Sequence, residues 1–495
     1  MSLLRQLNTL ESAGLIHLAA LQPELEYLFR HALVQDAAYS SLLKNDRKQL
    51  HLTTCQALEK LYPEQTDDLA ATLAYHYEKA EDRERAAHYF RRAGDLARNR
   101  YANVEALAFY QAATRLMAQS GELSASQRVA LAQLYEDTGD LLEILGQHNA
   151  AKEQYAAALG LVASSEKIWS ARLLRKTANA STAQDERGEA FQNYAEAEEV
   201  LGIAPGENAD DWYREWLQIQ LERNWAFYAW SKVEELSASI ERTRPVLERY
   251  GSPAQRAAFF HSRVYLSQRL HRYLIPPEDT AHTETALFAA QQSGDLRSIA
   301  HANWIRGVAL LLGSDLAAAE VHLQTSLRIV EQVGDLTTEI KCLTYAVVLY
   351  RRKGNVAVTR QLLPRLFQIA TDGKMDGYVA AAKATEAWLA WREGQIAKAL
   401  EEGKAALEIW ERIPWVYPFR WQALWILIAG TLRQGQMAET VNYAQKLMSP
   451  EQMALPDTLN ANLEAGIRAW EADRTAASRQ YFEVAVSDAT SQGYL

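Results

Sequence analysis

One spacing of small and aromatic residues recurs along this chain of 495 residues. An alanine is followed four positions later by an aromatic residue and, after three more positions, by a second alanine. Residues three and four apart share one face of an α-helix, so each copy presents two small side chains and a large one to a neighbouring helix. A unit of this kind cannot bury its apolar face alone, and its repetition predicts a stacked helical array. Three copies are complete: Ala86, Phe90 and Ala93; Ala151, Tyr155 and Ala158; and Ala190, Tyr194 and Ala197.

The spacing is that of the tetratricopeptide unit, a pair of antiparallel helices of about 34 residues. Residues 67–100 fit it closely, with Ala74 and Tyr77 on the first helix and Ala86 on the second. Looser copies follow after residue 300, with starts about 40 residues apart. Between residues 205 and 295 the spacing fades, although amphipathic helices continue. We therefore predict an all-α fold, a right-handed tetratricopeptide-like solenoid.

The first 60 residues depart from this pattern. Leucines at helical spacing end at Gly14, and two short apolar runs then flank a turn at Gln22-Pro23-Glu24. Helix, strand, turn and strand is the order at the end of a winged-helix domain, so one short β-hairpin is expected near residues 15–29. The predicted domains are a partial winged helix with linking helices over 1–60, N-terminal tetratricopeptide repeats over 61–205, degenerate helical repeats over 206–295 and C-terminal tetratricopeptide-like repeats over 296–495.

A motif follows the expected hairpin. It reads Phe-x-His-x-Leu-x-x-x-x-x-Tyr, and an Arg-x-x-x-His helix comes after it. Here the chain resembles the junction in bacterial signal-transduction ATPases of the STAND class, particularly those that join a cyclase domain, an ATPase module and a tetratricopeptide array. The resemblance implies the tetratricopeptide sensor region of such a protein, preceded by a truncated winged-helix remnant. The residues that carry it are Phe29, His31, Leu33 and Tyr39, then Arg47 and His51.

Several functions of that class do not follow from the resemblance. The sequence has no G-x-x-x-x-G-K-[ST] loop to cradle phosphate, so neither ATPase nor cyclase activity is transferred to it. It also lacks an H-E-x-x-H metal motif and a G-x-S-x-G nucleophile elbow. We expect no catalytic residue, no metal and no cofactor, and hence no enzyme activity.

Composition limits the compartment and the partners. Cys55 and Cys342 are too few for a disulfide framework, and no run of about 18 uncharged apolar residues could cross a membrane. A net charge of −10 without a Lys/Arg-rich block argues against nucleic acid. A cytoplasmic protein that does not bind a membrane is expected.

Tryptophan says more about a binding surface than these residues do: the chain has 13 copies, and ten of them gather at residues 212–230 and 388–425. Each could fill a gap between helices, where an aromatic side chain buries about 150–250 Å². Alternatively, some line the concave groove, which in the tetratricopeptide family is formed by the first helix of each pair. The matching positions near residue 132 are acidic, at Glu136, Asp140 and Glu143, so the groove would change sign along its length. The basic and aromatic residues at the groove positions are Trp304, Lys341, Arg351, Arg352, Trp388, Trp391, Arg392, Trp425 and Arg433.

A basic and aromatic groove suits a protein or an acidic or carboxylate-terminated peptide, or a small-molecule effector such as a sugar stacked on tryptophan. The sequence therefore predicts a non-catalytic protein- or ligand-binding sensor or scaffold module of a bacterial signalling protein. The alternative is a regulatory fragment of an ATPase, a nucleotide cyclase or a transcription regulator whose catalytic domains are absent from this chain.

Overall fold

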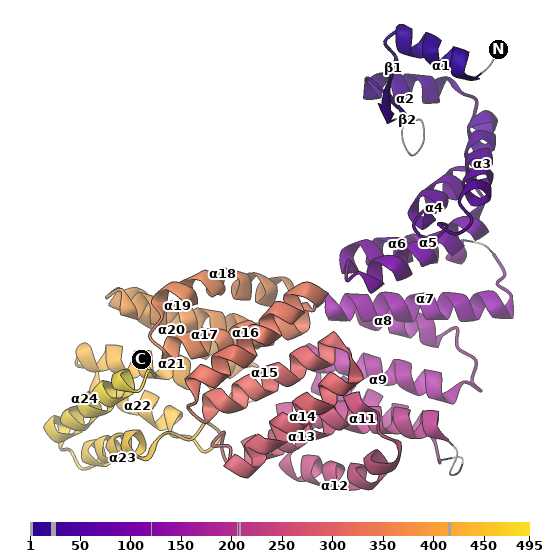
Figure 1. Cartoon of the computed structure of the whole chain (residues 1–495). Coiled ribbons are helices and arrows are strands. Elements are labelled where there is room, and N and C mark those ends of the chain that lie inside the picture. Colours follow the sequence, from indigo (N-terminus) through magenta and orange to yellow (C-terminus); the bar gives the residue numbers. More distant parts are fainter. Residues whose placement is uncertain (1–2, 21–25, 120, 205, 207–208, 414–416) are drawn as a thin grey trace. The chain divides into compact units, whose positions relative to one another are not determined.

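Helices make up almost all of the computed structural model, which describes residues 3–20, 26–119, 121–204, 206, 209–413 and 417–495 (Figure 1). Within these residues the one sheet is a two-stranded antiparallel hairpin. The all-α solenoid with a single short hairpin is thus confirmed, while the turn expected at residues 22–24 lies outside the described residues. The chain divides into two compact units, Met1–Gln127 and Arg128–Leu495, here called the N-terminal unit and the C-terminal unit.

The N-terminal unit begins with a helix, the hairpin and a second helix. In the hairpin Ile16 lies opposite Phe29 and Leu18 opposite Tyr27, and Ile16 is buried. Helices of the repeat type follow. Its elements are α1 (Leu3–Ser12), β1 (Ile16–Ala20), β2 (Glu26–Phe29), α2 (Ala32–Ser41), α3 (Lys44–Leu61), α4 (Ala70–Lys79), α5 (Arg83–Asn99) and α6 (Asn103–Ala118).

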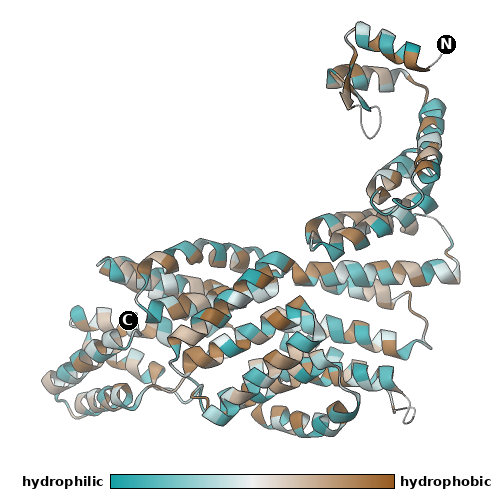
Figure 2. Ribbon diagram, in the orientation of Figure 1, coloured by the Kyte–Doolittle hydropathy of each residue, from teal (hydrophilic) through white to brown (hydrophobic). Residues whose placement is uncertain are grey.

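The rest of the chain alternates helices and short loops. Hydrophobic and hydrophilic residues interleave along these helices (Figure 2), as expected where each helix buries one face. The helices are α7 (Ala125–Ile144), α8 (His148–Leu159), α9 (Lys167–Ala183), α10 (Arg187–Leu201), α11 (Asp210–Ala229), α12 (Val233–Tyr250), α13 (Pro253–Leu270), α14 (Pro277–Ser293), α15 (Leu296–Leu312), α16 (Leu316–Val333), α17 (Leu336–Arg352), α18 (Val356–Asp372), α19 (Asp376–Arg392), α20 (Ile396–Arg412), α21 (Trp421–Arg433), α22 (Met437–Leu447), α23 (Asp457–Glu471) and α24 (Thr475–Ser491).

In the short loop after α16, a glycine ends one helix and an aspartate caps the next. Gly334 ends α16 with a φ of 65°, a conformation that glycine adopts without a steric penalty. The next residue, Asp335, caps α17, and its carboxylate accepts a hydrogen bond from the amide of Thr338 at 2.9 Å. One helix therefore stops and the next starts within two residues, which keeps consecutive helices antiparallel.

The small and aromatic residues of the repeat pack as their spacing predicts. Tyr77, Tyr155 and Tyr194 are all fully buried. A methyl group added to Gly139 would lie 2.4 Å from Cε1 of Tyr155, well inside van der Waals contact. The small residue of one helix is thus required by the aromatic residue of its partner.

Candidate ligand-binding cavity

The odd-numbered helices from α9 to α21 form one layer of the C-terminal unit. Each of them contacts the next odd-numbered helix as well as its own even-numbered partner. We call this the inner layer. Side chains that project from its free face come from the first helix of each pair.

Contacts between distant residues close the C-terminal unit on itself. The hydroxyl of Thr337, at the start of α17, donates to the carbonyl of Glu143 at the end of α7 at 2.9 Å, a separation of 194 residues. The guanidinium of Arg272, just after α13, donates to the carbonyls of Ser449 and Gln452 at 3.2 and 3.1 Å. The inner layer therefore curls until its distant helices face each other.

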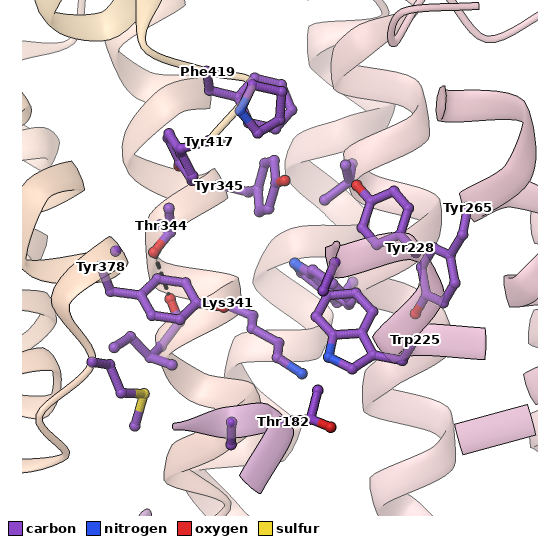
Figure 3. A pocket seen from close by; sticks show the side chains of 18 of the residues that line it. Thr182, Trp225, Tyr228, Tyr265, Lys341, Thr344, Tyr345, Tyr378, Tyr417 and Phe419 are labelled. Atoms are coloured by element: carbon purple, nitrogen blue, oxygen red, sulfur yellow. Dashed lines mark hydrogen bonds between the residues drawn. The ribbon is translucent and has the colours of Figure 1, made fainter. Parts of the chain in front are cut away.

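The curled layer encloses a cavity with a volume of about 150 Å³ (Figure 3). Side chains from α9, α11, α13, α15, α17 and α19 line it, together with residues 417–419. Its aromatic lining residues are Trp225, Tyr228, Tyr265, Tyr273, Trp304, Tyr345, Tyr378, Tyr417 and Phe419.

Lys341 supplies an ammonium group to this aromatic lining. It shares one face of α17 with Thr337 and Tyr345, four residues before and after it, and extends toward Trp225 (Figure 3). Its Nζ lies 4.8 Å from the ring centroid of Trp225 and 5.6 Å from that of Trp304, within the range of cation–π attraction. No hydrogen bond or ion pair joins it to another residue in the part of the chain that the structure describes. Burial lowers the pKa of Lys341.

The aromatic rings pack against one another. The ring of Tyr228 stacks on that of Tyr265 at a centroid distance of 4.8 Å, and its hydroxyl donates to the hydroxyl of Tyr273 at 3.3 Å. Phe419 continues the wall, with its centroid 4.8 Å from that of Tyr273 and 5.8 Å from that of Tyr345. Edge and stacked contacts of this kind hold the rings in fixed orientations around the cavity.

A second cation on the lining, Arg269, forms hydrogen bonds with the backbone of the protein itself. Arg269 donates from Nε and Nη2 to the backbone carbonyl of Tyr228, at 3.0 and 2.7 Å, and its guanidinium carbon lies 4.6 Å from the centroid of the Tyr228 ring. It thereby ties α13 to the end of α11. Lys341 is the lining cation whose donors are left for a ligand.

The acidic stretch expected in the groove is largely neutralised. Glu136 and Asp140 each accept from the ammonium of Lys176 at 2.7 Å. Beside them Arg175 pairs with both Glu215 and Glu222 at 2.6 Å. The sequence showed these carboxylates but not their partners on the neighbouring inner helices, so at Glu136 and Asp140 the expected acidic groove is corrected to an internal ion-pair network. Glu143 instead accepts a hydrogen bond from the hydroxyl of Tyr155 at 3.1 Å.

The structure places the nine predicted groove residues in different surroundings. Trp304 and Lys341 line the cavity, and Arg352 lines a smaller hollow that shares Tyr345 and Phe419 with it. Trp391 is half-buried, while Arg392 and Arg433 are exposed, and the Arg433 guanidinium carbon lies 4.5 Å from the centroid of the Trp391 ring. Trp388, Trp425 and Arg351 are buried, with 0, 0 and 1% of their surface exposed, so they do not face a ligand in an open groove as the sequence indicated.

Burial of Arg351 has a clear structural cause. Its Nη2 donates to the carbonyls of Gln422 and Tyr494, at 2.7 and 3.0 Å, and its guanidinium carbon lies 5.8 Å from the Trp388 centroid and 5.2 Å from that of Trp421. The last residues of the chain thus fold onto the end of α17 and cover this arginine. Burial lowers the pKa of Arg351 to about 9.

Most of the cavity lining was not foreseen. Two lining residues could have been suspected from the sequence: Trp225 belongs to the tryptophan-rich stretch at residues 212–230, and Tyr345 lies one helical turn after Lys341. Tyr378 and Phe419 carried none, because only the curvature of the inner layer brings them to the same space.

Neither a metal centre nor a membrane span is found among the described residues. No group of three or more His, Cys, Asp or Glu side chains there could hold an ion. None of the helices in the described ranges is both long and apolar enough to cross a bilayer. The absence of a cofactor and of catalysis stays a prediction.

No protein-family model matches the sequence, and no curated protein matches it either. The chain resembles several solved structures at low sequence identity. A Rap protein complexed with Competence and Sporulation Factor is 13% identical, covers 74% of this chain and 97% of its own, and has a TM-score of 0.51. NprR in complex with its cognate peptide NprX is 11% identical over 64% of this chain and 97% of its own, at a TM-score of 0.44. A STAND protein with a tetratricopeptide repeat sensor from Pyrococcus horikoshii is 14% identical over 82% of this chain and 58% of its own, at 0.37.

The Rap likeness, at this low identity, concerns the fold alone. It agrees with the helix pairs and the packing of the repeat residues described above. The chain is a tetratricopeptide-like helical solenoid.

Proposed function

We propose that this chain is a non-catalytic sensor module of a bacterial signalling protein, and that a peptide or small-molecule ligand occupies the cavity of the inner layer. The observation that carries the proposal is the ammonium group of Lys341, held among aromatic rings without an acceptor in the described chain. A concave site lined mainly by apolar and aromatic side chains, with a few placed polar groups, is the usual form of a ligand pocket.

Two further features support a sensor. The cavity is built from six helices of the inner layer, so a bound ligand would contact several repeats at once and favour one curvature of the array. The Rap protein of similar fold was solved with Competence and Sporulation Factor, and a protein or peptide partner is accordingly proposed for this chain.

The proposal is tested by blocking the cavity. Ala229 lines it, so Ala229→Trp should fill it, whereas Ala397→Trp adds the same side chain at an exposed position of α20. Libraries of short peptides and small molecules are screened for compounds that raise the melting temperature of the wild-type chain. We expect Ala229→Trp to abolish that rise and Ala397→Trp to keep it, with both variants folded by circular dichroism. A full response in Ala229→Trp would refute the cavity as the site.

A further inference from the structure

We infer that the cavity selects a carboxylate joined to an aromatic ring, with the carboxylate on the ammonium of Lys341 and the ring against the surrounding tyrosine and tryptophan side chains. This inference rests on the proposed function and names the chemistry of its ligand.

The charges on the lining favour an anion. A cage of aromatic rings commonly attracts a cation, but here the ammonium of Lys341 already lies against Trp225 and Trp304 and would repel a second one. The lining carries two cations, Lys341 and Arg269, and one carboxylate, Asp185. Two carboxylates act on Lys341 from outside the lining: Asp335 is paired with Arg297 at 3.3 Å, and burial raises the pKa of Glu143 to about 7. His148 adds no charge at neutral pH, since burial lowers the pKa of its imidazole to about 4.

Among possible ligand groups, an oxyanion would stabilise the buried ammonium group most. In the described chain its N–H donors meet ring faces and no oxygen acceptor, and a buried charge without such partners is costly. A carboxylate would accept short, charge-assisted hydrogen bonds there and neutralise the charge. An uncharged amide of the same shape could also accept a hydrogen bond from the ammonium, but it carries no negative charge to neutralise that group.

The volume sets the size of the ligand. One water molecule occupies about 10–15 Å³ of cavity volume. The cavity of about 150 Å³ therefore holds about ten water-sized groups. A single ring with a short acid chain has this size. Two sources share this chemistry: a free aromatic acid, and the last residue of a peptide that ends in phenylalanine or tyrosine.

The test compares an acid with its amide. Isothermal titration of the full chain with 3-phenylpropionate and 3-phenylpropionamide, which have the same shape, should show at least tenfold tighter binding of the acid. Lys341→Met keeps most of the aliphatic side chain and should remove the preference. Lys404→Met changes an exposed lysine of α20, paired with Glu439 at 3.9 Å, and should leave it unchanged.

A second pair of probes distinguishes the sources. A hexapeptide ending in phenylalanine is titrated with a free and with an amidated C-terminus. Tighter binding of the free than of the amidated peptide supports the carboxylate, and equal binding of the two overturns it. Preference for the free peptide over 3-phenylpropionate then supports a peptide terminus as the source, and the reverse supports a free acid.

The outcomes separate the two proposals. Equal binding of acid and amide by the wild-type chain overturns the carboxylate inference, and if Ala229→Trp blocks both compounds the proposed function still stands. Unchanged preference in Lys341→Met overturns the role of that lysine. Binding of no probe at millimolar concentration overturns the inference, while the library screen decides the proposed function independently. The wild-type comparison requires no variant, so misfolding of Lys341→Met does not remove the test.

Discussion

Truncation of Trp388 to alanine should strongly destabilise the C-terminal unit. The side chain is fully buried in α19, and the guanidinium carbons of Arg351 and Arg392 lie 5.8 and 5.7 Å from its ring centroid. Burial of about 150–250 Å² at about 25 cal/mol per Å² corresponds to about 4–6 kcal/mol. Replacement of a core tryptophan by alanine typically costs about 3–5 kcal/mol, so we expect a loss of about 4 kcal/mol in the free energy of unfolding.

Urea unfolding followed by far-UV circular dichroism measures this loss. Trp391→Ala is the matched control, because its ring is half-buried three residues further along the same helix; we expect it to cost less than about 2 kcal/mol. If Trp388→Ala unfolds within about 1 kcal/mol of the wild-type chain, the ring is accessible to solvent and the groove-lining interpretation of the sequence is restored.

Three further perturbations follow from packing and titration. Gly139→Ala should cost about 1–3 kcal/mol in urea unfolding, since its methyl group would lie 2.4 Å from a ring carbon of Tyr155; Gly188→Ala, with no atom within 4 Å of the added carbon, should be near neutral, and equal costs would contradict the packing argument. Burial lowers the pKa of His261 to about 3. The unfolded chain therefore binds a proton at this histidine below pH about 6.5 while the folded chain does not, and stability falls as the pH drops. Between pH 6.5 and 5, the free energy of unfolding of His261→Leu should therefore fall by about 2 kcal/mol less than that of the wild-type chain. Parallel curves of unfolding free energy against pH would refute this. Because burial also lowers the pKa of Lys341, binding of 3-phenylpropionate should weaken with rising pH before the pH reaches the value of about 10.4 at which a free lysine loses its proton, and should persist to higher pH in Lys341→Arg; calorimetry at a series of pH values checks both.

Local patterns in the sequence predicted local structure well. The strands at Ile16–Ala20 and Glu26–Phe29 lie where the two apolar runs indicated a hairpin. Tyr155 and Tyr194 are buried between paired helices, as their distance from the flanking alanines required. Both features depend on residues fewer than 20 positions apart, for which helix and strand periodicity is sufficient.

The cavity depends on a different kind of information. Trp225 and Lys341 come from α11 and α17 and meet because small rotations between successive repeats add up to a closed curve. The periodicity of the sequence does not determine the total rotation from the first repeat to the last. An error of one residue in a repeat register turns a side chain by about 100°, which is why the repeat pattern predicts groove positions for Arg351 and Trp388 although both are buried.

The contacts that close the C-terminal unit also restrict how its length can vary. In an open solenoid each repeat touches only its neighbours, so a repeat can be gained or lost without disturbing distant ones. Here Glu143 must reach Thr337, and Arg272 must reach Ser449. A helix pair inserted between either set of partners would separate them and open the cavity. Homologues that keep the cavity should therefore have the same number of helix pairs between residues 143 and 452, and should differ in length only in loops or beyond these limits.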